Sequence, residues 1–415
     1  MKNYKTLLLT FCLCYLGVNA QTVNKGDFYI TPNSLVVSKY PFENLEKGNF
    51  RNNGLLILED NLINNGDFFD YKGTIPQGKT ILKASKVQLL KGESITTFND
   101  LQLANSTLDK AFVIENNIVV AGKVNFDMGI GEIDKDKGSF TFLNKAEAYS
   151  ASDNSFLKGT VEKEGKQEFV FPVGDKGFYR PAGISAPENE KDLFSSEYIY
   201  DHKSFFESKS NISGVIDKLD AKEYWIIDRN SKTKSDIILT LSWDEKTTPK
   251  EILNNLEKSL RILRWDENMN IWVNEGGVVD IDNKTISTPT WVKNYGYFTL
   301  GTIKTDWILD GDIVIYNLVT PNGDGQNDYF LIENINRFPN NKVEIFNRWG
   351  TRVYETSNYD TTGNVFKGES QGRVTVSKGE LLPTGTYYYV ITYQYKDDKG
   401  SRMIKKSGYL HLETN

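Results

Sequence analysis

Short apolar runs, broken at intervals by asparagine and glycine, fill residues 21–150. Asn53-Gly54 precedes the apolar run 55–58, and a second asparagine-glycine pair, Asn65-Gly66, lies just before Phe68. Few stretches have helical spacing, so the pattern predicts an all-β array of short strands. Asparagines at the corners favour a β-solenoid-like array, in which each rung buries its face on the next; irregular meandering sheets are the alternative. Further short runs lie at 87–90, 101–103, 112–114, 118–120 and 123–126.

Strand-like runs continue through the middle of the chain with less regular spacing. We predict a β-rich connecting segment over 151–215 and an immunoglobulin-like β-sandwich over 216–303. Within the sandwich, the runs 260–265 and 271–273 flank a polar stretch that is typical of a hairpin turn. Residues 249–260 are the one stretch with helical or turn character.

A short linker, 304–311, leads to the last hundred residues. Residues 312–415 hold about seven strand-like runs, which is the size of a small β-sandwich. The predicted fold class is therefore all-β, with a solenoid-like array, a middle immunoglobulin-like sandwich and a C-terminal seven-stranded sandwich.

The N-terminus has the pattern of a secretory signal. Two lysines precede an apolar core at 7–16, which is too short to span a bilayer, and small residues suit cleavage after Ala20. Cys12 and Cys14, the two cysteines of the chain, lie inside this predicted signal peptide (1–20). The mature chain then has no cysteine, which excludes disulfides and thiol chemistry.

Charge and histidine content limit the classes of function that the chain can have. The formal charge of −6 becomes −8 without Lys2 and Lys5, so no basic face is expected and nucleic acid is not a predicted partner. His202 and His411 are the only histidines, and no nucleophile elbow, metal-histidine cluster or phosphate loop appears. We therefore expect no enzyme, although a glycosidase with two distant carboxylates stays open.

The sharpest local pattern lies near the start of the C-terminal domain. Asn322, Asp324 and Asp328 alternate with glycines, and Gln326 can offer its backbone carbonyl. Oxygen ligands on a glycine-bent loop suit Ca²⁺, which is the one cofactor that the sequence suggests. Asn-Gly and Asp-Gly are also favoured turn dipeptides whose side chains cap their own backbone. The turn and the Ca²⁺ loop are both retained as hypotheses.

A second pattern, Asn347-Arg-Trp-Gly350, lies between two strand-like runs. As a hairpin corner, it would use a positive φ at Gly350, pack Trp349 on the core and stack Arg348 on an aromatic ring. Alternatively, it is a surface that the export machinery recognises.

A third pattern, Pro383-Thr-Gly385, starts a tyrosine-rich strand. Strand alternation predicts Tyr387, Tyr389 and Ile391 on one face, and the residues between them on the other.

In this order and at this end of the chain, the three patterns and a final strand resemble the gliding motility-associated C-terminal domain. This domain is the type B sorting signal of the type IX secretion system of Bacteroidota. Here 365–368 stands where the family carries a tryptophan-containing turn, with Phe366 as the aromatic, and 369–379 is longer than the family pattern. The motif residues are Pro321, Asn322, Gly323, Asp324, Gly325, Asn327, Asp328, Asn347, Arg348, Trp349, Gly350, Pro383, Gly385, Tyr387 and Gly408.

The resemblance implies export through the periplasm to the cell surface or extracellular space. It implies two partners, the type IX translocon and an outer-membrane helper barrel of the PorP/SprF type.

The remainder of the chain would be a passenger with one of two roles. The first is a non-enzymatic surface protein in adhesion, gliding or surface assembly, which binds further copies of itself or surface polysaccharide. The second is a secreted polysaccharide-active hydrolase or carbohydrate-binding protein with tryptophans as a sugar platform. We expect Trp243 and Trp272 in the core, which favours the first role. The candidate platform tryptophans are Trp225, Trp243, Trp265, Trp272 and Trp291.

Overall fold

The structure is a computed structural model, and it describes residues 20–68, 77–107, 109–213, 216–230, 232–304, 313–371, 379–397 and 400–414. The predicted signal peptide up to residue 19, and most of the predicted linker, lie outside the described residues. Strand accounts for 50% and helix for 4%, so the all-β prediction is confirmed. None of the described helices has the length and apolar character needed to cross a membrane.

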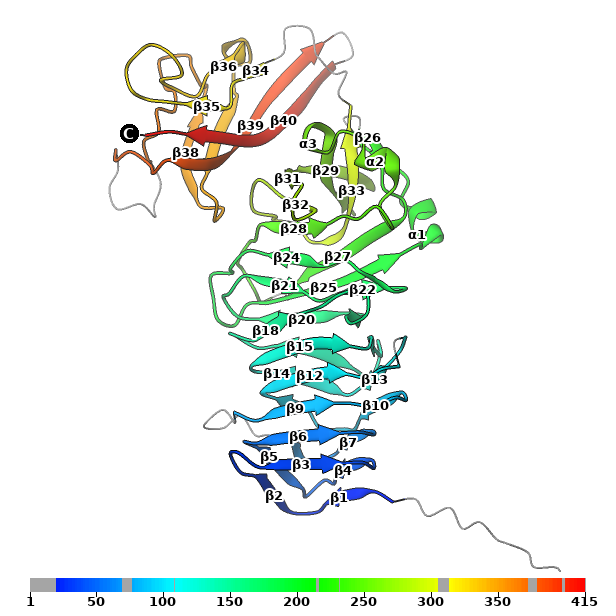
Figure 1. The fold of residues 1–415 in the computed structure, drawn as a ribbon. Coiled ribbons are helices and arrows are strands. Elements are labelled where there is room, and N and C mark those ends of the chain that lie inside the picture. Colours follow the sequence, from blue (N-terminus) through cyan, green and yellow to red (C-terminus); the bar gives the residue numbers. More distant parts are fainter. Residues whose placement is uncertain are drawn as a thin grey trace, which may run out of the picture.

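The N-terminal region is a β-solenoid of about six turns, as predicted. Each turn contributes one strand to each of three parallel sheets, and the turns stack along the long axis of the molecule (Figure 1). The first sheet contains β1 (Thr22–Asn24), β4 (Phe42–Asn44), β7 (Leu62–Asn64), β10 (Gln88–Lys91), β13 (Phe112–Glu115), β16 (Gly131–Ile133) and β19 (Leu157–Lys158). The second contains β2 (Asp27–Ile30), β5 (Asn49–Asn52), β8 (Asp67–Phe68), β11 (Thr96–Phe98), β14 (Asn117–Val120), β17 (Ser139–Phe142) and β20 (Val161–Glu164). The third contains β3 (Leu35–Ser38), β6 (Leu55–Leu58), β9 (Lys79–Leu82), β12 (Asp100–Ala104), β15 (Lys123–Met128) and β18 (Glu147–Tyr149).

A column of phenylalanines fills the solenoid behind the second sheet. Parallel in-register pairing sets Phe28 beside Phe50 and Phe50 beside Phe68, because equivalent positions of successive rungs point the same way. Ring centroids are 5.4 Å apart for Phe28 and Phe50, 4.6 Å for Phe50 and Phe68, and 5.6 Å for Phe68 and Phe98. Each fully buried ring contributes on the order of 2 kcal/mol of apolar burial.

A ladder of buried asparagines marks one corner of the solenoid. Asn24 Nδ2 donates to Asn44 Oδ1, and Asn44 Nδ2 donates to Asn64 Oδ1, each at 2.9 Å across 20 residues of chain. Asn64 Nδ2 then donates to Thr96 Oγ1 on the next rung. A Cβ at Gly48 would lie 2.1 Å from Asn44 Oδ1, so the glycine leaves room for the ladder. The stretch Asn64-Asn65-Gly66 of the sequence thus lies at this corner of its rung.

The second solenoid sheet continues into the middle of the chain. There β20 pairs antiparallel with β25, and the sheet runs on through β27, β33, β29 and β30, with β26 beside β33. A five-stranded sheet, β21-β24-β28-β32-β31, packs against it in one common core. The strands of the extended sheet are β25 (Leu193–Tyr200), β26 (Ile216–Leu219), β27 (Glu223–Arg229), β29 (Leu260–Asp266), β30 (Ile271–Gly276) and β33 (Gly296–Ile303). The other strands are β21 (Phe169–Phe171), β22 (Gly174–Asp175), β23 (Phe178–Tyr179), β24 (Ala182–Ile184), β28 (Leu239–Ser242), β31 (Val278–Asp280) and β32 (Thr285–Ser287), of which β22 and β23 form a separate pair.

The predicted ranges 151–215 and 216–303 therefore share both sheets, and their predicted boundary falls inside one unit, which we call the middle module. Its immunoglobulin-like strand order stays a prediction. The predicted hairpin is present, because β29 pairs with β30 and Asp266 lies opposite Ile271. The helices of the module are α1 (Lys203–Ser208), α2 (Lys250–Leu253) and α3 (Leu256–Ser259), and the last two fall within the predicted helical stretch.

The C-terminal domain has a separate core and lies beside the far end of the middle module (Figure 1). Its described residues form a five-stranded sheet, β35-β40-β39-β37-β38, and a two-stranded sheet, β34-β36. Tyr387, Tyr389 and Ile391 are buried on one face, as alternation predicted. The elements are β34 (Val314–Ile315), β35 (Leu318–Val319), β36 (Ile332–Glu333), the 3-10 helix η1 (Ile335–Arg337), β37 (Lys342–Phe346), β38 (Arg352–Ser357), β39 (Gly385–Asp397) and β40 (Gly400–Leu412).

Candidate functional site

The loop after β35 is organised by carboxylates that cap its own backbone. The two oxygens of Asp328 accept the backbone N–H groups of Gly323 at 2.7 Å and Gly325 at 2.8 Å. Asp324 Oδ1 accepts the N–H of Gln326 at 2.7 Å. Both glycines have positive φ, 81° and 84°, which L side chains rarely adopt. The loop geometry is therefore that of paired turns.

The Ca²⁺ hypothesis for this loop stays a prediction. Asn322 Nδ2 donates to Asp324 Oδ2 at 3.0 Å, and the N–H of Asp324 donates to Asn322 Oδ1 at 3.1 Å. Bonds from Gln326 and Asn322 hold the pKa of Asp324 below its usual value. The Gln326 carbonyl accepts from Thr320 Oγ1 at 3.2 Å. Within the described ranges, no three His, Cys, Asp or Glu side chains group as they would around a metal ion.

Asn347 shapes the corner between β37 and β38. Its Oδ1 accepts the N–H groups of Trp349 and Thr351, at 3.0 and 2.9 Å, and its carbonyl accepts that of Gly350. Gly350 has φ of 74°, as the hairpin-corner hypothesis required. A Cβ on Gly350 would lie 2.8 Å from Ile238 and 2.9 Å from Trp291 Nε1, so this corner packs against the middle module.

The core-packing prediction for Trp349 is wrong, because its side chain is 68% exposed. The preceding strand residue, Phe346, fills the buried position, and the turn directs Trp349 outwards. Arg348 stacks on it as predicted, with Cζ 5.0 Å from the ring centroid. An exposed aromatic and cationic pair is thus available for recognition.

The third turn is bonded to the end of the described chain, because Thr384 Oγ1 donates to the carbonyl of Thr414 at 2.8 Å. Tyr387 Oη donates to the carbonyl of Pro383 at 2.8 Å, and the N–H of Leu382 donates to the carbonyl of Gly368 at 2.7 Å. A Cβ on Gly408 would lie 2.5 Å from Tyr389 Oη, because the tyrosine ring covers this position of β40. Gly408 therefore has a packing role.

Phe366 occupies the aromatic place of the atypical turn and is fully buried. Its N–H donates to Tyr359 Oη at 3.0 Å, and Tyr359 Oη donates to the carbonyl of Phe330 at 2.6 Å. The N–H of Phe330 returns to the Phe366 carbonyl at 2.8 Å. Sequence reasoning missed Tyr359, since a tyrosine in an irregular stretch carries no periodic signal.

Residues 313–412 match the family model of the CHU_C Type IX secretion signal domain. This match confirms the resemblance for the C-terminal domain, which is a quarter of the chain. It supports secretion by the type IX system, export to the cell surface or extracellular space, and interaction with the secretion machinery. No curated protein and no solved structure matches the chain. We now call this part of the chain the sorting domain.

The two histidines lie apart. His202 Nδ1 is 2.9 Å from Tyr224 Oη, and its ring stacks on Phe205. His411 is an exposed residue of β40. Among the described residues, the structure shows no hydrogen bond between either histidine and a carboxylate.

Two buried carboxyls in the middle module were not foreseen. Glu223 accepts from Tyr198 Oη at 2.6 Å and from Thr248 Oγ1 at 2.5 Å. Burial raises the pKa of both Asp220 and Glu223, and their mutual repulsion raises that of Asp220 further. Sequence patterns treat charged residues in strands and turns as facing solvent, which is why Asp220 and Glu223 were missed.

Proposed function

We propose that this protein is a non-enzymatic cell-surface protein, which the sorting domain directs through the type IX system. Its passenger, made of the solenoid and the middle module, acts in adhesion, gliding or surface assembly. The observation that carries the export part is the family match over 313–412, joined to three motif turns that each have a defined geometry. A signal peptide at 1–20, a periplasmic route, a Bacteroidota source and a PorP/SprF-type helper barrel are parts of the same proposal.

The choice of an interaction role rests on where the aromatic and acidic side chains lie. Trp225, Trp243, Trp265 and Trp272 are at most 4% exposed, so they support cores and form no surface platform. Glu223 is bonded to Tyr198 and Thr248, and both Asp220 and Glu223 are closed off from solvent. A hydrolase would need two carboxyls that a sugar can reach, and this buried pair is not accessible.

The export proposal is tested by truncation after Ile303 in the native host. Full-length and truncated chains are compared by digestion of whole cells with protease, with a periplasmic protein as the control for an intact outer membrane. We expect the full-length chain to be digested and the truncated chain to be protected. Resistance of the extracted truncated chain to mild proteolysis checks that it is folded. Equal surface exposure of both chains would contradict the proposal.

A further inference from the structure

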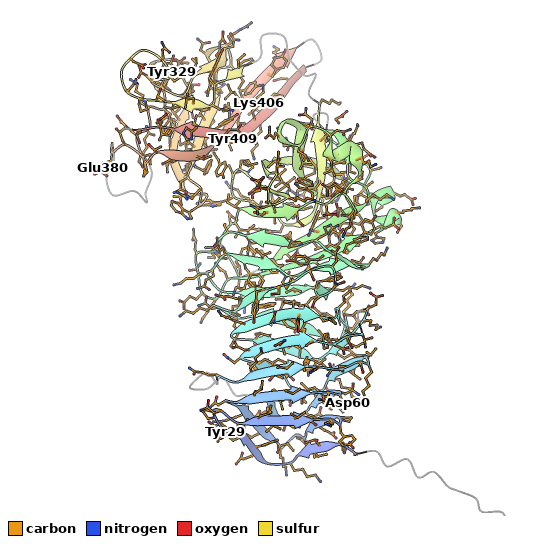
Figure 2. All side chains as sticks on the ribbon, in the orientation of Figure 1. Tyr29, Asp60, Tyr329, Glu380, Lys406 and Tyr409 are labelled. Atoms are coloured by element: carbon orange, nitrogen blue, oxygen red, sulfur yellow. The ribbon has the colours of Figure 1, made fainter. Side chains whose placement is uncertain are left out.

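A groove of about 1290 Å³ lies between the middle module and the sorting domain. One wall is the loop between β32 and β33, including Trp291 and Asn294. The other wall is the outer face of the sorting-domain sheet, including Glu344, Arg352 and Thr392. Figure 2 shows the sorting domain beside the upper end of the middle module, with Tyr409 on β40, a strand that contacts β31 of the module.

The charges along the groove cancel. Among the described residues that line it, four side chains are acidic and four are basic. Four of the charged side chains on the sorting-domain wall form ion pairs: Lys342 Nζ lies 2.6 Å from Glu355, and Arg352 Nη1 lies 2.8 Å from Glu344. Paired charges attract neither a polyanion nor a polycation strongly, because their fields offset each other at the distance of a ligand. The groove therefore suits a ligand without net charge.

The remaining lining is rich in neutral hydrogen-bonding groups. Seven of the lining residues are Asn, Gln, Ser or Thr, including Asn294 and Thr392. Trp291 adds an aromatic surface that is 39% exposed. Hydroxyl and amide groups beside an open aromatic face match the two faces of a sugar, which carries hydroxyls at its rim and C–H groups above its ring.

A peptide strand has no comparable support in this wall. β37 is paired on both sides, with β38 and β39, so its backbone groups are already bonded. On the outer edge of β38, Val353 accepts the N–H of Gln371 at 2.8 Å. A peptide strand binds by adding to a free sheet edge, and β37, at the centre of this wall, offers none.

We propose that the groove between the middle module and the sorting domain binds an uncharged oligosaccharide. Its volume exceeds the usual range for small-molecule pockets, about 300–1,000 Å³, so several sugar units fit along it. The site needs both walls and so exists only while the sorting domain remains attached. The inference deepens the proposed function by naming a ligand class, and it does not depend on the export route.

The test uses the purified chain from Gln21 to Asn415 and isothermal titration calorimetry. The probes are cellohexaose, maltohexaose and xylohexaose, with an oligogalacturonate of similar length as the acidic comparison. We expect at least one neutral probe to bind and the acidic probe to bind more weakly. Loss of the aromatic contact in Trp291→Ala should weaken binding by about tenfold.

Trp349→Ala is the matched control, since this tryptophan is exposed but is not part of the groove lining. It should bind within about twofold of the parent, a difference well under 1 kcal/mol. Because Trp291 touches the Gly350 corner, Asn294→Ala provides a second variant in an exposed loop, and it should weaken binding with an unchanged melting temperature. Failure of all neutral probes, tighter binding of the acidic probe, or equal losses in the two tryptophan variants would overturn the inference. None of these outcomes alters the export result.

Discussion

The solenoid and the sorting domain are both all-β, but they are stabilised in different ways. In the solenoid, equivalent residues of successive rungs contact one another, as in the phenylalanine column and the ladder through Asn24, Asn44 and Asn64. In the sorting domain, unlike residues that do not repeat along the chain meet once, as where Tyr359 joins Phe330 to Phe366.

This difference predicts how far the destabilising effect of a substitution extends through the structure. A solenoid rung contacts mainly its neighbours, so its stability is close to a sum of local terms. A small domain with one aromatic core is expected to unfold as a unit. Single substitutions in the two regions should therefore differ in reach as well as in size.

Asn44→Ala should have the largest effect on stability. It removes the acceptor of Asn24 Nδ2 and the donor to Asn64 Oδ1, and it leaves buried polar atoms unpaired. We expect a loss of about 3 kcal/mol in unfolding free energy by denaturant titration. Hydrogen exchange should rise in β1, β4 and β7 and stay unchanged in the sorting domain. Asn154→Ala, on an exposed solenoid turn, is the control and should change stability by under about 0.5 kcal/mol. Faster exchange throughout the chain would contradict the local picture.

Tyr359→Phe should have the next largest effect on stability, and this effect should extend through the whole sorting domain. The buried hydroxyl donates to one carbonyl and accepts from one N–H, and its loss should lower the free energy of unfolding by about 2 kcal/mol. Exchange should rise across all sorting-domain strands and leave the solenoid unchanged. Tyr316→Phe, whose exposed hydroxyl donates to Glu333, is the matched control. An effect confined to the strands next to Tyr359 would break the comparison.

The regularity of the solenoid is also why the sequence predicted it. The Asn-Asn-Gly punctuation before Phe68 has a direct structural counterpart in the ladder corner. The antiparallel pairing of β20 with β25, which fuses the solenoid to the middle module, joins segments with no shared pattern. Local alternation carries no information about such a pairing, and the predicted boundary between 151–215 and 216–303 fell inside one unit.

Only those features of the candidate site that depend on local sequence were predicted. Gly350 and the stacking of Arg348 follow from local chemistry, and the structure has both. The exposure of Trp349 depends on which neighbouring residue fills the core, and the groove depends on how two modules meet. Neither is encoded in a local pattern.

Asp220→Asn probes the middle module, which lies between the solenoid and the sorting domain. Burial, and then Glu223, raise the pKa of Asp220, so the folded state holds this proton more tightly than the unfolded chain does. The contribution of Asp220 to the free energy of unfolding is therefore greatest below a pH of about 4, the pKa of the unfolded chain. It is lost as the pH rises through the raised pKa of the folded state. Asparagine cannot ionise and keeps an oxygen for the N–H of Lys222. The variant should gain about 1 kcal/mol at pH 8 relative to the parent, and little at pH 4. Thermal melts across this range measure the difference, and parallel curves would refute it.

Asp328→Ala should have the smallest effect. The two backbone N–H groups that it releases are exposed, so we expect a loss of about 0.5–1 kcal/mol in the sorting domain. Addition of EDTA to the parent protein should leave its melting temperature unchanged if the loop is a pair of turns. A lower melting temperature in EDTA that Ca²⁺ restores would instead favour the cation loop, since a bound ion stabilises the folded state.

Transfer of the sorting domain tests most directly whether it carries the export signal. Residues 304–415 are fused behind a secretory signal peptide and a fluorescent protein, and cells are examined by protease digestion and surface antibody labelling. We expect the fluorescent protein to reach the cell surface or the medium with the domain attached, and to stay in the periplasm when the fusion ends before residue 304. Retention of both fusions in the periplasm would contradict the claim that these residues carry the export signal.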